Sequence, residues 1–340
     1  MACTIPEIFI HERAALAPLA GVTGSEFRQM CVGFGARPVM TEMVSSDGFV
    51  RGRPSGKTAR FLRFEESERP IGFQFFGADP DIMAEAASKA QDLKPDFIDI
   101  NAGCPVKKVI AKGSGSALLR NPFLLARIVE KMVNVSNVPV TVKIRSGWDQ
   151  SSINAVEVAR VCMDSGARAI IVHPRTKSQG FSGSADWTVI KRVQEKVDIP
   201  VVGSGDIKTA EDFQRMKDET GVEYVMVGRT AMNNPFIFRE IVESADENAR
   251  SKQADYVEKL ELALNQLDRL AVKTPEKNAV FTMRKFFGWY SKGAIGGAQF
   301  RSKIFRAVTV EEVKKIVRDF QYEYRDTTTR TNVFNNMVIS

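Results

Sequence analysis

The chain has 340 residues, of which 44% are hydrophobic and 26% charged, and its formal net charge is +7. This length accommodates one large domain and one small one, and no run of residues approaches the ~18 apolar residues of a membrane-spanning helix. Residues 1–13 lack the apolar stretch of a signal peptide, and the four cysteines show no CxxC spacing. We therefore expect a monomeric cytoplasmic protein without disulfides, and with only two histidines we expect no metal site.

Strand and helix patterns alternate through the first two thirds of the chain. Short apolar runs predict strands at residues 14–17, 39–41, 71–76, 97–100, 140–144, 169–172, 201–202 and 224–227. Helical patterns lie between them at residues 25–33, 79–92, 121–135 and 151–165, and further helices begin at Asp186 and Thr209. Eight strand–helix units predict an α/β fold, a (β/α)₈ TIM barrel over residues 1–243.

Only helical periodicity remains in the last part of the chain. Residues 244–253 are polar and predict a linker, and four amphipathic segments follow at residues 255–272, 275–292, 298–307 and 310–324. These segments predict a small helical bundle domain over residues 254–326, followed by a flexible tail at 327–340.

The positive charge is concentrated in this second domain. Residues 250–330 contain 17 Lys and Arg and 10 Asp and Glu, so they hold the entire net charge of +7. Between Lys277 and Val310 there are seven basic residues and no acidic one. A merely solvated helix face usually mixes both signs, so this segment favours a polyanionic partner such as a nucleic acid.

The stretch Asp99-Ile100-Asn101-Ala102-Gly103-Cys104-Pro105 follows a buried strand. Gly103 and Pro105 end the strand in a tight turn, which places Asn101 and Cys104 at its carboxyl end. Ligands bind at that end of parallel barrels. An isolated thiol is most often an inert core residue, so the interpretation of Cys104 depends on its surroundings.

The surroundings of Cys104 are the carboxyl ends of the other predicted strands. The predicted strands deliver polar and glycine-bearing turns to the same end of the barrel: Pro18, Leu19, Ala20, Gln74, Lys143, Arg145, His173, Arg175, Ser204, Gly205, Asp206, Gly228 and Arg229. Glycine turns after the last two strands form the phosphate site of many barrels. A phosphate-bearing ring cofactor beside cations suggests flavin mononucleotide (FMN), with Lys143 stabilising negative charge on the ring and Cys104 serving as a proton donor.

Several motifs together resemble the tRNA-dihydrouridine synthases, and among them the bacterial B-type branch. The resemblance covers most of residues 10–325. The motifs are residues 17–23 (APLAGVT), 99–105 (DINAGCP) with Lys107-Lys108-Val109, 114–119 (SGSALL), 142–148 (VKIRSGW), 173–176 (HPRT) and 205–207 (GDI), with Arg284-Lys285 and Trp289-Tyr290 in the helical domain. The sequence departs from the family pattern at Ser204, Pro174, Ser114, Thr230 and Phe286.

The resemblance implies an FMN-bound barrel, NADPH as the reductant and a helical domain that binds tRNA. It implies that Cys104 protonates uracil C5 while a hydride from the flavin reaches C6. The implied FMN contacts are Pro18, Leu19, Ala20, Gln74, Lys143, His173, Ser204, Gly205, Asp206, Gly228 and Arg229. The implied substrate contacts are Asn101, Arg145, Arg175, Lys107, Arg284 and Lys285.

Three other interpretations stay open at this point. The same chemistry could act on another RNA, such as ribosomal RNA, and the sequence does not distinguish these substrates. A flavin barrel that reduces a free pyrimidine fits poorly with the basic segment Lys277–Val310. An RNA-binding protein without catalysis fits poorly with the presence of Cys104, Lys143 and His173 together.

Overall fold

The computed structural model describes residues 4–338 except residues 11, 53–55, 57 and 246–253, and it describes the side chains of the C-terminal helix only up to residue 324. The chain divides into two compact units. One contains residues 1–231 and 235–251, and the other contains residues 232–234 and 252–340.

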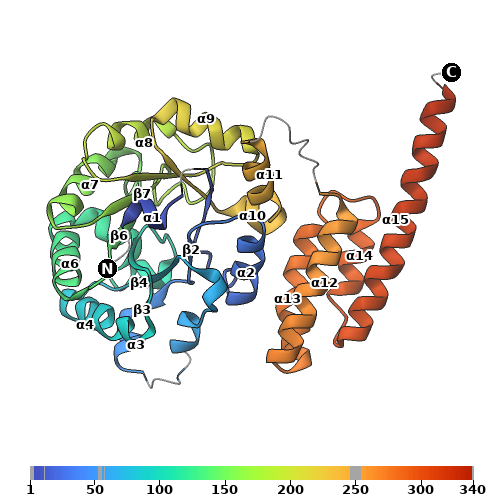
Figure 1. Cartoon of the computed structure of the whole chain (residues 1–340), viewed down its shortest axis with the longest axis horizontal. Coiled ribbons are helices and arrows are strands. Elements are labelled where there is room, and N and C mark those ends of the chain that lie inside the picture. Colours follow the sequence, from blue (N-terminus) through green and yellow to red (C-terminus); the bar gives the residue numbers. More distant parts are fainter. Residues whose placement is uncertain (1–3, 11, 53–55, 57, 246–253, 339–340) are drawn as a thin grey trace. The chain divides into compact units, whose positions relative to one another are not determined.

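The first unit is a barrel of parallel strands, as the alternating pattern predicts (Figure 1). Its strands are β1 (Ala15–Leu16), β2 (Val39–Met40), β3 (Val44–Ser45), β4 (Ile71–Phe76), β5 (Phe97–Ala102), β6 (Val140–Arg145), β7 (Ala169–His173), β8 (Val201–Ser204) and β9 (Tyr224–Val227). Neighbouring strands follow the order β1-β9-β8-β7-β6-β5-β4-β2, and β3 pairs with β4. The amide of Leu16 donates to the carbonyl of Pro38 and that of Arg37 to Ala14, each at 3.0 Å, so backbone hydrogen bonds also join β1 to the segment entering β2.

Helices surround the strands (Figure 1). They are α1 (Ile5–Ile8), α2 (Ser25–Gly33), α3 (Ser46–Val50), α4 (Pro80–Ala90), α5 (Lys107–Ile110), α6 (Pro122–Val135), α7 (Ala155–Asp164), α8 (Trp187–Gln194), α9 (Ala210–Thr220), α10 (Arg229–Asn233) and α11 (Ile237–Ser244). Short 3₁₀ turns are η1 (Ala59–Leu62), η2 (Glu66–Glu68), η3 (Gln91–Leu93), η4 (Gly115–Arg120) and η5 (Gln150–Ser152). The side chains of Asp79, Asn121 and Thr209 cap α4, α6 and α9 by accepting hydrogen bonds from first-turn amides.

The amino end of the barrel is filled by the segment that follows α1. The ring of Phe9 lies 5.8 Å from that of Phe97 and 5.9 Å from that of Tyr224, the first residues of β5 and β9. Ile5 and Ile8 belong to the same buried cluster. Because this end is packed with apolar side chains, the opposite, carboxyl end is the one available for a ligand.

The second unit is a helical bundle, as expected (Figure 1). Its helices are α12 (Tyr256–Lys273), α13 (Glu276–Tyr290), α14 (Gly297–Ile304) and α15 (Val310–Val338). α12 packs on α13 and α15, and α14 packs on α13 and α15. α15 continues through residues 327–338, where the sequence predicts a flexible tail, because residues 310–338 contain no proline or glycine to end the helix. The linker expected at 244–253 lies outside the described residues beyond Ala245.

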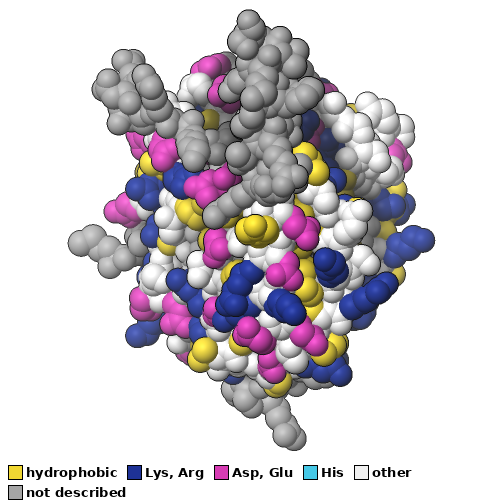
Figure 2. Space-filling model, turned by 90° about the vertical axis from the view of Figure 1, so that its right-hand side faces the viewer, with side chains coloured by type: hydrophobic (Ala, Val, Ile, Leu, Met, Phe, Trp, Pro, Cys, Tyr) yellow, Lys and Arg dark blue, Asp and Glu magenta, His cyan; other side chains and the backbone are white. Residues whose placement is uncertain are grey.

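Basic and acidic side chains are interspersed on the face of the molecule that Figure 2 shows, with hydrophobic side chains among them. Positive charge is therefore not segregated over this whole face, and the acid-free segment between Lys277 and Val310 remains the distinct basic feature. Within the described part of the chain, no helix combines the length and apolar character that crossing a membrane requires.

Candidate active site

The carboxyl ends of β5 to β9 bring most of the expected site residues together. Strand register places Asn101 of β5 beside Lys143 of β6, and Arg145 of β6 beside His173 of β7. Hydrogen bonds then join the ends of β7, β8 and β9 to one another. The site thus combines a thiol, a lysine, an imidazole and three arginines at one end of the barrel.

Cys104 lies in a turn that Asn101 organises. The side-chain oxygen of Asn101 accepts hydrogen bonds from the amides of Gly103 at 3.2 Å and Cys104 at 2.9 Å. Asparagine supports such turns because its short side chain reaches its own backbone two or three residues on. Burial raises the pKa of the Cys104 thiol, although the backbone at Val106 and the charge of Arg145 act in the opposite direction. The thiol is therefore protonated at neutral pH and can act as an acid.

Arg145 connects the Cys104 turn to the loop that follows β7. Its side chain is almost fully buried, and its Nε donates to the carbonyl of Gly103 at 2.8 Å. Its Nη1 donates to the carbonyls of Thr176 at 3.0 Å and Gly180 at 2.7 Å. Arg145 therefore fixes two loops relative to each other, a role that residue type alone did not predict.

Lys143 and Asp99 lie close enough inside the barrel for the charge of each to act on the other. Burial raises the pKa of Asp99 to about 7, while hydrogen bonds from Thr141 and Gln74 and the charge of Lys143 oppose that shift. Burial lowers the pKa of Lys143 to about 8. Among the described residues, no hydrogen bond or ion pair within 4 Å engages the Lys143 amine. The amine is therefore available to a ligand at the barrel mouth.

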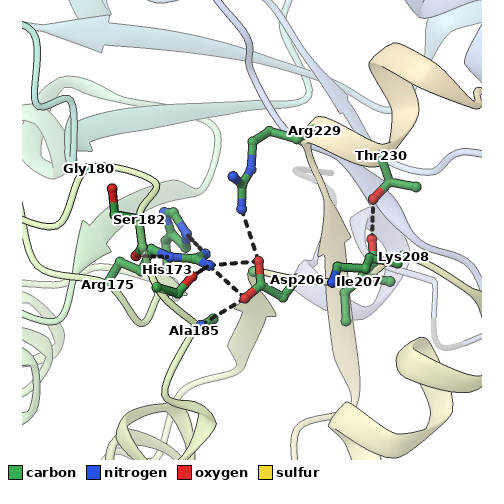
Figure 3. A network of polar contacts seen from close by, with 12 residues as sticks. His173, Arg175, Gly180, Ser182, Ala185, Asp206, Ile207, Lys208, Arg229 and Thr230 are labelled. Atoms are coloured by element: carbon green, nitrogen blue, oxygen red, sulfur yellow. Dashed lines mark hydrogen bonds and ion pairs between the residues drawn. The ribbon is translucent and has the colours of Figure 1, made fainter. Parts of the chain in front are cut away.

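Asp206 joins the ends of β7, β8 and β9 (Figure 3). Its carboxylate accepts hydrogen bonds from Arg175 at 2.7 and 2.9 Å, from Arg229 at 2.9 Å and from the amide of Ala185 at 2.8 Å. Although burial acts to raise it, the pKa of Asp206 lies below its usual range because of the Ala185 amide and Arg175. The Nε2 atom of His173 lies 3.4 Å from Nη1 of Arg175.

The turn after β8 has a backbone that few residues adopt. Gly205 has φ +127°, and Asp206 has φ +58°, a left-handed conformation that is uncommon for a residue with a Cβ atom. A Cβ atom at position 205 would lie 3.0 Å from the His173 ring. The indole nitrogen of Trp187, at the start of α8, donates to the Gly205 carbonyl at 3.0 Å. Contacts from Arg175 and Ala185 on the β7–α8 connection, and from Trp187 at the start of α8, thus hold this turn in place.

The electrostatics of the site favour an anion. Burial and then the surrounding cations lower the pKa of His173 to about 2. These cations are Lys143, Arg145, Arg175 and Arg229. A neutral imidazole, an exposed arginine and a glycine turn that leads toward helix α9 are groups that bind phosphate.

The residues of this site fit FMN. Arg229 and the Gly205 turn suit its phosphate, and the unengaged Lys143 amine suits the ring. A Cβ atom placed on Gly228 would meet only Ala17, at 3.6 Å, so the backbone there is open to close approach. Pro18 and Leu19 are half-buried and Ala20 is exposed at the end of β1, whereas Ser204 is buried at the end of β8.

The remaining predicted site residues lie in different surroundings, and some already have hydrogen-bond partners within the protein. Gln74 is buried, donates to Asp99 and accepts from Asn101, so both ends of its amide are occupied. Lys107 is exposed at the start of α5. Arg284 and Lys285 lie on α13 in the second unit, where Arg284 donates to the Ala307 carbonyl at 2.7 Å.

Three residues near the site were not predicted. Asp99 lies under the site, Trp187 supports the Gly205 turn, and Phe181 is about half exposed with its ring centroid 4.8 Å from the guanidinium carbon of Arg229. Of these, Asp99 could have been predicted from the sequence, because a carboxylate inside an apolar strand needs hydrogen-bonding or charged partners. Nothing in the sequence indicates which loop would place Trp187 and Phe181 here.

Fold and site together define a TIM-barrel protein whose carboxyl end carries several cations, a glycine turn and a thiol. The fold is similar to that of histamine dehydrogenase from Rhizobium sp. 4-9, with a TM-score of 0.54 and 13% identity over 75% of this chain and 48% of that one. That likeness shows the fold alone.

The sequence comparisons define the family. The family described as "Dihydrouridine synthase (Dus)" matches residues 15–325. The chain is 38% identical over 311 residues to tRNA-dihydrouridine synthase B of Pseudomonas aeruginosa, covering 92% of this chain and 93% of that protein. It is 36% identical over 314 residues to the probable tRNA-dihydrouridine synthase 1 of Synechocystis sp., covering 92% and 87%. The chain belongs to the dihydrouridine synthase family, and within it to the B type.

Proposed function

We propose that this protein is a tRNA-dihydrouridine synthase, which reduces particular uridines of tRNA to 5,6-dihydrouridine with FMN as cofactor and NADPH as reductant. The names of its relatives give the substrate class. The observation that carries the proposal is the position of Cys104, a protonated thiol in a fixed turn, at the same end of the barrel as Lys143 and the glycine turn at Gly205.

The chain's own groups would hold the cofactor across the barrel mouth. Arg229, His173 and the Gly205 turn would bind the phosphate, and Pro18, Leu19 and Ala20 would border the ring. The Lys143 amine would stabilise negative charge on the ring. Bound FMN would supply the hydride for uracil C6.

Cys104 would supply the proton for uracil C5. A positioned acid must lie within hydrogen-bonding reach of the atom it protonates, and the double anchorage of its turn by Asn101 and Arg145 provides that fixed position. The target base must leave its stack to reach a half-buried thiol inside the barrel mouth, so the enzyme would act on an extruded nucleotide. Lys107, exposed three residues after Cys104, would contact the RNA backbone nearby.

The second unit would bind the body of the tRNA. Lys277, Lys292, Lys303 and Arg306 are exposed within the acid-free segment, and Arg284 and Lys285 lie on α13. Phosphate contacts of this kind fix the register of an RNA without reading its sequence. They would determine which uridine reaches the barrel.

The test is reconstitution with defined RNA. The purified protein should be yellow and release FMN, and with NADPH it should add two hydrogens to uridines of an unmodified tRNA transcript, as measured by mass spectrometry of digested nucleosides. A ribosomal RNA fragment and free uridine serve as competing substrates. A folded protein that cannot be loaded with FMN, or one that reduces only a competing substrate, would contradict the proposal.

A further inference from the structure

Asp99 begins a chain of hydrogen bonds that ends at Cys104. Strand register sets Gln74 of β4, Asp99 of β5 and Thr141 of β6 side by side on three neighbouring strands. All three side chains are buried. The Asp99 carboxylate accepts a hydrogen bond from Thr141 at 2.6 Å and another from the Gln74 amide nitrogen at 2.7 Å.

This series of hydrogen bonds continues toward the mouth of the barrel. The oxygen of the Gln74 side chain accepts a hydrogen bond from the Asn101 amide nitrogen at 2.8 Å. The Asn101 oxygen in turn accepts from the backbone amide of Cys104 at 2.9 Å. Three successive hydrogen bonds therefore connect a buried carboxylate to the turn that carries the thiol.

The two ends of this series of hydrogen bonds, the Asp99 carboxylate and the Cys104 backbone amide, require the same orientation of the side-chain amides between them. The hydrogen bonds from Thr141 and Gln74 and the charge of Lys143 favour the ionised form of Asp99. An ionised carboxylate only accepts hydrogen bonds, so the nitrogen of Gln74 must face it. A backbone amide only donates, so the oxygen of Asn101 must face Cys104. These two requirements leave one consistent arrangement, with the Gln74 oxygen toward the Asn101 nitrogen.

We propose that Asp99 is a positioning residue for Cys104: its carboxylate orients the side-chain amides of Gln74 and Asn101, and through them it holds the turn that presents the thiol. The assignment of Cys104 as the acid rests on the proposed function, whereas the orienting role of Asp99 rests on the geometry. Asp99 also lies near the Lys143 amine, whose charge it partly balances.

Replacing Asp99 with asparagine removes the requirement that sets this orientation. The new amide can donate to the Gln74 oxygen, which would turn the Gln74 nitrogen toward the Asn101 nitrogen. Two facing donors repel each other, so Asn101 would rotate and its oxygen would leave the Cys104 amide. Gln74→Met breaks the same chain but retains the carboxylate beside Lys143.

The test measures the thiol directly, in the full-length protein with FMN bound. All variants carry Cys3→Ser, and Cys31 and Cys162 are fully buried, so iodoacetamide alkylation of the folded protein reports on Cys104. We expect both Asp99→Asn and Gln74→Met to change the alkylation rate about tenfold or to shift its pH profile, since the turn loses a side-chain hydrogen bond. Only Asp99→Asn should also make the midpoint potential of bound FMN more positive, because it removes a negative charge near Lys143.

Asp96→Asn is the matched control. Asp96 lies just before β5 and accepts hydrogen bonds from Arg69 at 2.9 Å and from the Ile71 amide at 2.7 Å, without a link to Cys104. An unchanged alkylation profile in both test variants would overturn the proposal and leave Asp99 as a core residue only. If Asp99→Asn does not fold, Gln74→Met alone decides the question. Failure of the wild type to reduce tRNA would count against the proposed function and would leave the alkylation result unaffected.

Discussion

Cys104 is the residue on which the proposed chemistry depends most directly. Cys104→Ala should leave the reduction of FMN by NADPH near the wild-type rate, because that step needs no thiol. The reduction of uridine should fall by ~10²–10⁴-fold, the usual contribution of a positioned acid. Single-turnover oxidation of the reduced protein by tRNA would measure the second step separately.

Cys31→Ala and Cys162→Ala are the controls, since both thiols are fully buried in α2 and α7. Equal loss in both half-reactions of Cys104→Ala would mean that the substitution disturbs the flavin. Oxidation at the wild-type rate would mean that another group, or water, is the acid.

The pH dependence of uridine reduction follows from the state of the same thiol. An acid is competent while protonated, so activity is present below the pKa and lost above it. Because burial raises the pKa of Cys104 above its ordinary value of about 8.5, the rate should stay level through neutral pH and fall only at alkaline pH. Single-turnover rates in a buffer series would test this, and a decline that begins below about pH 8 would contradict it.

At the residue level, the sequence was most informative for reactive side chains that stand at the end of a predictable strand. Cys104, Lys143 and His173 were placed correctly at the carboxyl ends of the strands, because residue order along a strand determines which end a residue reaches. The partners of Arg145 were not predictable. Its three acceptors are backbone carbonyls at Gly103, Thr176 and Gly180, and only the folded loops bring these together.

Among the elements, the β7–α8 connection and the start of α8 support the turn at Gly205, and one substitution tests that support. Trp187→Phe keeps most of the ring but removes the hydrogen bond to the Gly205 carbonyl. A hydrogen bond of this kind contributes about 0.5–1.5 kcal/mol, so the Kd for FMN should rise ~2- to 10-fold. Flavin fluorescence during titration of the apoprotein would measure it.

Trp289→Phe in α13 is the matched control, since that ring belongs to the second unit. An unchanged FMN affinity in Trp187→Phe, together with an unchanged melting temperature, would show that the turn keeps its shape without this hydrogen bond.

Secondary structure followed from the sequence where length and capping were clear. The predicted strands at 71–76 and 224–227 have the observed bounds, and helix α2 coincides with the predicted 25–33. The two-residue strand β3 and the short helix α1 were missed, because so few residues show no periodicity. Helix α11 was also missed, although it is amphipathic and lies almost entirely within the residues 1–243 predicted for the barrel.

For the whole molecule, the distribution of charge predicts how RNA binds. Lys292→Gln, Lys303→Gln and Arg306→Gln together remove three exposed cations of the acid-free segment. The slope of log affinity against log salt should become shallower by about 0.7–0.9 for each phosphate that the variant no longer neutralises. Filter binding of tRNA at several salt concentrations would give this slope, and FMN content should not change.

A variant that neutralises three exposed cations of the barrel unit, Arg160→Gln, Arg192→Gln and Lys196→Gln, changes the net charge equally. If it reduced the salt dependence as much as the first variant, general charge rather than the acid-free segment would govern binding.

The closure of the barrel also constrains how this protein is made. Ala15 pairs with Met226, and Leu16 with Val227, so the first strand leaves the ribosome well before its partner, which is translated about 210 residues later, roughly 10–40 s at usual rates of synthesis. Until then β1 presents an unpaired edge, a template for wrong association with other chains. Pro18 and Arg229, which would both contact FMN, follow β1 and β9 closely, so that pairing is what brings their segments together. FMN would therefore bind only after the barrel has closed. Added flavin would not stabilise a nascent chain before β9 has left the ribosome.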